Sequence, residues 1–253
     1  MPAVDLNSDL GEGFGTYTSA DDEAMLDIVS SANVACGFHA GDPHIMANIF
    51  ALAKAKSVAI GAHPGYRDLW GFGRRVLPHT LAEVEQITAY QIGAALALAN
   101  LSGHRITFVK PHGALGNLAD GNPEVATVVA RAIRAVNPHL ILVATALGCL
   151  VKAGEDHSLR VVHEIFADRT YAEDGQLLPR SLPGSIVTDP ELALARTLHM
   201  LEAGGIITQK QNLLTTPIDT ICVHGDTPHA VAMARALKDG LLAKGFVVEA
   251  FAP

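Results

Sequence analysis

Short apolar segments alternate with longer amphipathic segments seven times along this chain of 253 residues. The short segments are rich in Ala, Val, Ile and Leu, which is typical of buried parallel strands. Strands are predicted at Ala3–Asn7, Ser31–Cys36, Val58–Ala62, Ile106–Lys110, Leu140–Ala144, Arg160–Ile165 and Thr220–His224. Helices are predicted at Ala20–Val29, Asp42–Lys56, Leu81–Leu101, Pro123–Val136, Gly148–Glu155, Asp189–Ala203 and Pro228–Lys244. Because consecutive strand–helix units form parallel sheets with right-handed crossovers, we expect an α/β protein.

Two features favour a closed barrel over an open doubly wound sheet. No Gly-rich phosphate turn follows the first strand, and polar residues follow nearly every strand rather than a single switch point. We therefore expect a (β/α)7-type, TIM-like barrel in which residues 1–253 form one domain. Ala167–Thr188 is long and polar and predicts a loop over the site. Gly205–Ile218 is typical of a small hairpin, and Phe246–Phe251 is expected to cover the bottom of the barrel or to add an edge.

The composition argues against several classes of protein. Apolar residues make up 49% of the chain and charged residues 17%, which is typical of a chain that buries a substantial core. The net charge of −8 and the scattered Lys and Arg argue against a nucleic-acid partner. Three widely spaced cysteines predict buried thiols rather than disulfides. No signal peptide is visible, and Ile87–Leu101 is too short and polar to span a membrane, so we expect a soluble, cytoplasmic protein.

Polar and ionisable residues follow six of the seven predicted strands. They lie in the motifs DLNSDLGEG, SANVACGFHAGDP, GAHPGYRDLWGFGRR, VKPHGALGN, HEIFADRTY and ICVHGD. Because the carboxyl ends of parallel strands meet at one rim, these side chains are expected to face a shared cavity. Unpaired charges at this density would be costly in a dry core, which favours a wet or ligand-filled pocket. Among these residues are Asn7, Asp9, Glu12, Asn33, His39, His63, Lys110, His112, Glu164, Asp168, Arg169, His224 and Asp226.

The histidines of this rim indicate acid–base chemistry, because imidazole transfers protons near neutral pH and also binds metals. The catalytic candidates are Asp9, His39, His63, His112 and His224. A divalent metal, if present, would be held by Asp9, His39 and His63, which follow successive strands. No H-x-x-x-H or H-E-x-x-H spacing supports such a site, so a metal cofactor stays an open question.

Cationic residues also lie near the predicted rim. Lys110 ends an apolar strand just before Pro111, which favours a side chain held inside to meet a carboxylate or a phosphate. Arg74 and Arg75 are consistent with solvated loop residues and equally with substrate or partner binding. Their segment, RDLWGFGRR, is expected to form an ordered lid with its tryptophan, Trp70, packed under a loop. The chain has no G-x-x-x-x-G-K-[ST] motif, so any ATP is not bound in the P-loop manner.

The assembled motifs resemble those of the LamB/YcsF family. DLNSDLGEGFG, SSANVACGFHAGDP, GAHPGYRDLWGFGRR, VKPHGALGN, FADRTY–DG–L–PRS–PG and TICVHGDTP occur in order over nearly the full length. The resemblance implies a barrel of the glycoside hydrolase/deacetylase kind. It also implies the role of the A subunit in a 5-oxoprolinase made with subunits B and C, in which ring-opening of 5-oxo-L-proline to L-glutamate consumes ATP. Matching positions are Asp9, Glu12, His39, His63, Lys110, His112, Asp168, Arg169, His224 and Asp226.

The roles within this site are hypotheses. In one mechanism His63 or Asp9 acts as general base on water, and His112 or His224 as proton donor. Binding of substrate and phosphate is assigned to Asn7, Glu12, Lys110, Asp168, Arg169 and Asp226.

The sequence departs from the family pattern at two positions, and it leaves two other functions open. An aromatic residue is expected where Gly116 stands, and a glycine where His229 stands. The first departure is expected to remove a contact from the cavity wall, and the second places a histidine at the start of the last helix. The alternatives are a stand-alone metal-dependent amidohydrolase or deacetylase, and a non-catalytic anion-binding subunit.

Overall fold

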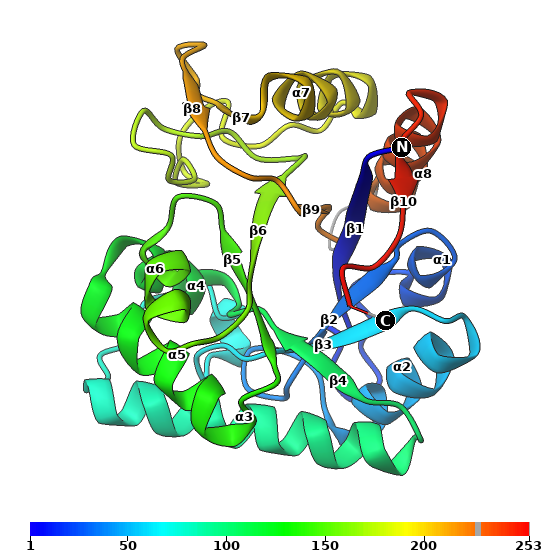
Figure 1. The fold of residues 1–253 in the computed structure, drawn as a ribbon. Coiled ribbons are helices and arrows are strands. Elements are labelled where there is room, and N and C mark those ends of the chain that lie inside the picture. Colours follow the sequence, from blue (N-terminus) through cyan, green and yellow to red (C-terminus); the bar gives the residue numbers. More distant parts are fainter. Residues whose placement is uncertain (226–228, 253) are drawn as a thin grey trace.

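Seven parallel strands close into a barrel in the computed structural model, which describes residues 1–225 and 229–252 (Figure 1). The strands are β1 (Ala3–Leu10), β2 (Ser31–Ala35), β3 (Ala59–His63), β4 (Ile106–Val109), β5 (Ile141–Thr145), β6 (Val161–Phe166) and β9 (Thr220–Cys222). They pair in chain order, and β9 pairs with both β6 and β1, which closes the sheet. The predicted TIM-like barrel of seven strands is therefore confirmed.

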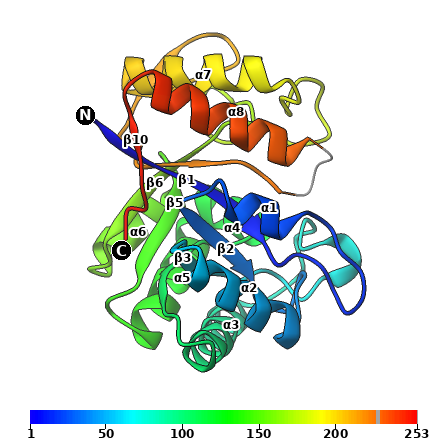
Figure 2. The ribbon, with the colours of Figure 1, turned by 90° about the vertical axis from the view of Figure 1, so that its right-hand side faces the viewer.

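Helices surround this barrel, and Figure 2 shows α7 and α8 lying side by side, separated by the strands from α2, α3 and α5. The helices are α1 (Asp22–Leu26), α2 (Pro43–Ala55), α3 (Leu81–Leu101), α4 (Gly113–Gly121), α5 (Pro123–Val136), α6 (Cys149–Asp156), α7 (Pro190–Ala203) and α8 (Ala230–Ala243). The bounds of α3 and α5 are as predicted. The sequence determines the start of α3 locally, because Thr80 and Glu83 form a reciprocal capping box.

The structure differs from the predicted elements in three places near the site, two of them element bounds and one a helix that was not predicted. β1 continues three residues further than predicted, because Asn7 to Leu10 pair with β2, so Asp9 lies within the strand. α1 is shorter than predicted, because Ser30 bonds to β1 through both its amide and its hydroxyl group. α4 was missed altogether, since the glycines at positions 113, 116 and 121 are typical of a loop.

The segments predicted to interrupt the alternation behave as expected. β7 (Gly205–Ile207) and β8 (Leu213–Thr215) form an antiparallel hairpin. The loop of residues 167–188 covers the barrel mouth, and Leu177 to Arg180 line the cavity below it. β10 (Val247–Val248) pairs with β1 and adds an edge, and the residues after it cover the bottom of the barrel.

Alternate residues of each strand face the barrel interior, which is apolar at one end and polar at the other. At the apolar end Phe108 packs edge-on against Phe251 of the C-terminal tail, with 5.1 Å between ring centroids. Gly61 is required beside Phe108, because a Cβ atom there would lie 2.1 Å from the ring. The apolar cluster comprises Ala59, Phe108, Ile141, Val143, Val162 and Ala252. It closes the lower end and leaves the carboxyl ends of the strands for polar groups.

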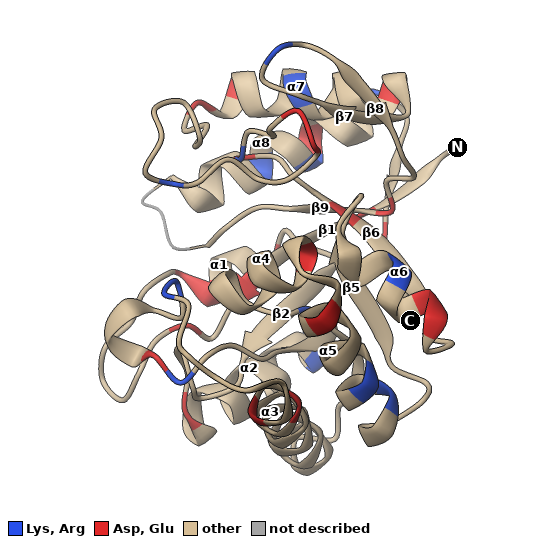
Figure 3. Cartoon of the chain, turned by 90° about the vertical axis from the view of Figure 1, so that its left-hand side faces the viewer, with Lys and Arg blue, Asp and Glu red and all other residues tan. Residues whose placement is uncertain are grey.

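The surface bears charges of both signs. Figure 3 shows Lys and Arg scattered among the acidic residues rather than gathered along one helix. Among the described residues, no helix combines the length and apolar character needed to cross a membrane. Cys36 and Cys222 are buried, as predicted, whereas Cys149 is half-buried, and all three are free thiols.

Candidate active site

A buried polar network fills the upper barrel. The Asn7 side-chain amide donates hydrogen bonds to Glu164 Oε1, at 3.0 Å, and to Thr220 Oγ1, at 2.7 Å. The Asn33 amide donates to Asn7 Oδ1 at 2.7 Å and to Asp9 Oδ1 at 2.9 Å. These bonds fix the orientation of Asp9 and Glu164, because they join different strands across the interior.

Lys110 lies at the centre of this network. Its Nζ is 3.1 Å from Asp9 Oδ1, 2.9 Å from Glu164 Oε1 and 3.1 Å from Cys222 Sγ. Burial alone would raise the pKa of Asp9, but the neighbouring His63 and Lys110 outweigh this effect and hold that pKa well below its usual value. Burial raises the pKa of Glu164. The anionic charge that Lys110 meets in the structure therefore belongs to the protein itself.

A histidine cluster lies beside Asp9. His63 Nε2 is 3.4 Å from Asp9 Oδ2 and 3.1 Å from His112 Nδ1. Glu12 Oε1 is 3.5 Å from His112 Nδ1 and 3.6 Å from His39 Nε2. A left-handed turn at Gly11, with φ of +68°, carries Glu12 to this position.

These side chains form a candidate metal-binding cluster that differs from the predicted one. Glu12, His39, His63 and His112 each offer a ligand atom, and the four atoms lie within 4.8 Å of one another. Asp9 was predicted as a ligand but is not part of this set, and its Oδ1 accepts hydrogen bonds from Lys110 and Asn33. Burial lowers the pKa of His39 and His112 well below the usual value, which favours neutral imidazoles.

His224 lies on the opposite side of the network. Its Nδ1 is 2.7 Å from Asp168 Oδ2 and 3.0 Å from Asp168 Oδ1. Burial would raise the pKa of Asp168, but the adjacent His224 lowers it below the usual value, so Asp168 is a carboxylate that orients the ring. Asp226, also predicted as a site residue, lies outside the described residues.

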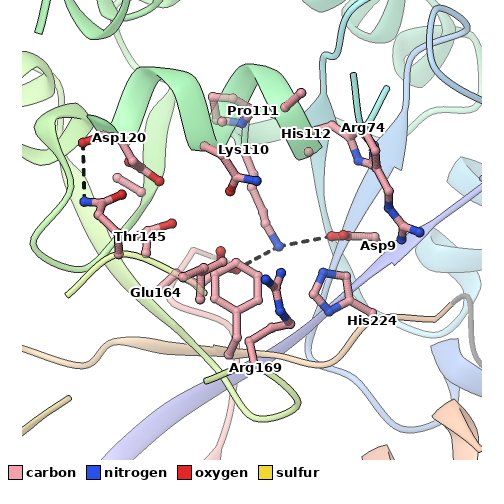
Figure 4. Close-up of a pocket in the computed structure, with 18 of the residues that line it drawn as sticks. Asp9, Arg74, Lys110, Pro111, His112, Asp120, Thr145, Glu164, Arg169 and His224 are labelled. Atoms are coloured by element: carbon pink, nitrogen blue, oxygen red, sulfur yellow. Dashed lines mark hydrogen bonds and ion pairs between the residues drawn. The ribbon is translucent and has the colours of Figure 1, made fainter. Parts of the chain in front are cut away.

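A cavity of about 590 Å³ opens over these groups (Figure 4). Among the residues predicted to catalyse the reaction or to bind substrate, those lining it are Asp9, Glu12, His63, Lys110, His112, Arg169 and His224. Asn7, His39 and Asp168 lie one layer behind the wall and contact the residues that line it. The structure therefore brings the side chains from six strand ends to one place.

Guanidinium groups make one part of the cavity wall cationic. Arg74, Arg169 and Arg180 all line it. Arg169 is 4% exposed and donates hydrogen bonds to the carbonyl groups of Ser185 and Leu178 within its own loop. Burial and the neighbouring Arg180 lower the pKa of Arg169 to about 10, so it remains a cation at neutral pH.

The lid segment differs from the prediction in one respect. Trp70 is 98% exposed and does not pack under a loop. Asp68 accepts a hydrogen bond from the Gly71 amide and forms an ion pair with Arg75, which holds the turn with the indole outward. Phe72, not Trp70, lines the cavity.

The structure adds residues that the sequence analysis missed or left without a role. Asp120, on α4, lines the cavity, and burial raises its pKa to about 7. Glu164 was listed among the rim residues but was assigned neither a catalytic nor a binding role. Gly116 lies in the cavity wall as expected, but a Cβ there would be 2.7 Å from the Pro111 carbonyl oxygen, so an aromatic residue would require a backbone shift. His229 precedes α8, as expected, and is exposed.

The fold and site together define a class: a (β/α)7-type barrel with acids, imidazoles and cations around a cavity at the carboxyl ends of its strands, where barrel enzymes carry their active sites. Within that class the chain belongs to the LamB/YcsF family, which matches residues 4–253.

Known proteins support this assignment. A protein of Azorhizobium caulinodans, named as the A subunit of 5-oxoprolinase, is 56% identical over 253 residues, covering 100% of both chains. The crystal structure of a lactam utilization protein from Thermus thermophilus superposes with a TM-score of 0.92 at 42% identity, covering 98% of this chain and 100% of that one. The catalytic domain of a peptidoglycan N-acetylglucosamine deacetylase from Eubacterium rectale shares the fold alone, with a TM-score of 0.52 at 11% identity, over 99% of this chain and 90% of that domain.

Proposed function

We propose that this chain is the A subunit of an ATP-dependent 5-oxoprolinase. With subunits B and C it would open the lactam ring of 5-oxo-L-proline to give L-glutamate, while ATP is hydrolysed to ADP and phosphate. The observation that carries the proposal is the convergence of Asp9, Lys110, Arg169 and His224 on one cavity in a chain whose relatives are named for this activity. The lactam utilization protein with the same fold supports the same substrate class.

The chemistry explains the coupling to ATP. A five-membered lactam is a stable amide, and its carbonyl carbon is a weak electrophile. Transfer of a phosphoryl group to that oxygen activates the carbonyl carbon, and we assign this step to the complex with subunits B and C. Water then adds to the carbon, the ring C–N bond breaks as the nitrogen takes a proton, and a second water hydrolyses the resulting acyl phosphate to glutamate and phosphate.

The cavity residues suit this ring-opening. Asp9 is a carboxylate held ionised by Lys110, and it accepts the proton of the attacking water. His224, oriented by Asp168, donates the proton to the ring nitrogen. Guanidinium groups in the cavity wall hold the carboxylate and phosphoryl groups of the substrate; they belong to Arg74, Arg169 and Arg180.

The test is ATP-dependent release of glutamate from 5-oxoproline by a mixture of the three subunits. Asp9→Asn is expected to reduce turnover by roughly 100-fold or more, the usual contribution of a general base. Lys152→Met is the matched control, because the Lys152–Asp156 pair is exposed on α6. Absence of glutamate release from the wild-type mixture would refute the proposal.

The same assay separates the alternative functions. Turnover of an amide by this chain alone, without ATP, would identify a stand-alone amidohydrolase. Full turnover by the Asp9→Asn mixture, with the fold unchanged by circular dichroism, would remove Asp9 from the mechanism. If His224→Gln also left turnover unchanged, the chain would be a non-catalytic binding subunit.

A further inference from the structure

The tautomers of two cavity histidines are fixed by the backbone. His63 Nδ1 is 2.6 Å from the Lys110 carbonyl oxygen, and His112 Nε2 is 2.8 Å from the Phe72 carbonyl oxygen. A carbonyl oxygen only accepts hydrogen bonds, so each of these nitrogens carries the hydrogen. In neutral rings, His63 Nε2 and His112 Nδ1 therefore both present lone pairs.

These two lone pairs face each other across 3.1 Å. Two acceptors at that distance repel unless a positive centre lies between or beside them. A positive centre shared by the two nitrogens would relieve the repulsion. A cation that accepts both lone pairs removes this repulsion. The second nitrogen of each ring donates its N–H to a backbone carbonyl group, which is the arrangement that metal-binding histidines adopt.

We infer that Glu12, His63 and His112 bind a divalent transition-metal ion of the Zn²⁺ class in the cavity wall. All three residues line the cavity. Two imidazole nitrogens and a carboxylate oxygen are a known ligand set for catalytic zinc, in which the fourth position is left for water or substrate. The binding site itself does not depend on the proposed function, whereas its use in activating water does.

The distances agree with such a site. Ligand bonds of about 2.1 Å in a tetrahedral site place the ligand atoms about 3.4 Å apart. His63 Nε2 and His112 Nδ1 are 3.1 Å apart, and His112 Nδ1 and Glu12 Oε1 are 3.5 Å apart. The remaining pair, Glu12 and His63, lies within 4.8 Å and requires only a small approach of the glutamate side chain.

His39 is close to these ligands but is assigned a different role. Its ring stacks on His112 with 3.7 Å between centroids and 3° between planes. A lone pair lies in the plane of its ring, so an ion in the plane of His112 is out of line for His39. His39 is also absent from the cavity wall. We assign it to positioning His112 by stacking.

The proposed ion would complete the water-activating site. A bound Zn²⁺ lowers the pKa of its water to about 7. Asp9 Oδ2 lies 3.4 Å from the ligand atom of His63, so it is placed to accept the proton from such a water. In the proposed ring-opening, such a water would supply the oxygen that adds to the activated carbonyl carbon.

The experiment measures metal binding by the full chain alone, without ATP, substrate or other subunits. Chelator-stripped protein is titrated with Zn²⁺ by calorimetry and with Co²⁺ by visible absorption, which reports tetrahedral coordination. One equivalent is expected to bind. Glu12→Gln and His112→Ala are each expected to weaken binding by more than about 100-fold, beyond the 10–100-fold typical of residues behind the ligands. The control variants are His224→Ala, in the same cavity, and His163→Ala, which pairs with Asp219.

The outcomes are separable from those of the glutamate assay. His39→Phe is expected to change the metal affinity by no more than about 10-fold. Phenylalanine can still stack on His112, and the lost ring nitrogens of His39 are not ligands in this proposal. Failure of the wild-type chain to bind either ion would overturn the inference, as would equal binding by wild-type protein and the isosteric Glu12→Gln variant with its fold intact. Metal binding without glutamate release would refute only the proposed function.

Discussion

Lys110 is the buried cation that balances Asp9 and Glu164, and replacing it with methionine should destabilise the protein strongly. Each ion pair has a separation near 3 Å, which corresponds to about 5 kcal/mol of attraction at an effective dielectric constant of 20. Most of that is offset by the desolvation of the charges. Lys110→Met leaves the carboxylates buried without a cation, and such losses typically cost about 3–5 kcal/mol. At about 2–4 °C per kcal/mol for a chain of this size, Tm should fall by roughly 6–20 °C.

The assay is thermal and urea unfolding followed by circular dichroism. The matched control is Lys152→Met, because Lys152 and Asp156 also form an ion pair, of 2.9 Å, but both are exposed. That variant should change stability by no more than about 0.5 kcal/mol. The double variant Lys110→Met/Glu164→Gln should recover part of the loss, because it removes one of the two carboxylates that repel each other.

The loss should also depend on pH. Without Lys110, the folded-state pKa of Glu164 rises further above its unfolded value, and the pKa of Asp9 rises from its lowered value. A raised carboxyl pKa contributes stability that is present at low pH and is lost as the pH rises through the folded pKa. The deficit should therefore be smaller at pH 5 than at pH 8. An equal deficit at both values, or a loss no larger than that of Lys152→Met, would refute the charge-balance reasoning.

Three further predictions follow from single contacts. Gly61→Ala should lower stability by about 1–3 kcal/mol, because its Cβ would lie 2.1 Å from the Phe108 ring, and Phe108→Leu should restore part of it; an unchanged Tm would contradict this. Asp168→Asn should lower kcat for glutamate release by roughly 100-fold with little change in KM, because His224 loses its orienting carboxylate. Burial raises the pKa of Asp120 to about 7, so its contribution to stability is lost as the pH rises through that value. Asp120→Asn should therefore make the free energy of unfolding decline less steeply between pH 5 and 8. An unaltered slope would exclude Asp120 as the source of the decline.

The sequence located the site because strand ends in a parallel barrel must converge. Asp9, His63, Lys110 and His224 were selected for following different strands, and all four line the cavity. The helix that carries Asp120 could not be predicted, since its glycines obscure the helical pattern; Gly113 and Gly116 are there because the backbone of other segments lies close to them.

Which side chains contact each other within the site could not be predicted from the sequence, for a different reason. Asp9 and Glu12 are three residues apart, and both were candidates for a metal or a substrate. In the structure Asp9 lies beside His63 and Lys110, whereas Glu12 lies beside His39 and His112. This division depends on the left-handed turn at Gly11 and on Lys110, which lies 101 residues after Asp9. Residue type and strand order predict which residues line the cavity. The hydrogen bonds among them depend on contacts between strands that are far apart in the sequence.

Lys110 forms ion pairs with carboxylates of the protein, so an anionic substrate is expected to be bound by other residues. Its Nζ contacts Asp9 and Glu164, and the other Lys or Arg side chains described in the cavity wall are arginines. Arg169 and Arg180 both come from the loop that covers the mouth, and Arg169 is held by carbonyl groups of that loop. The segment that covers the cavity is thus also a segment that supplies its anion-binding groups. Binding of an anionic substrate and ordering of this loop are therefore expected to be thermodynamically coupled.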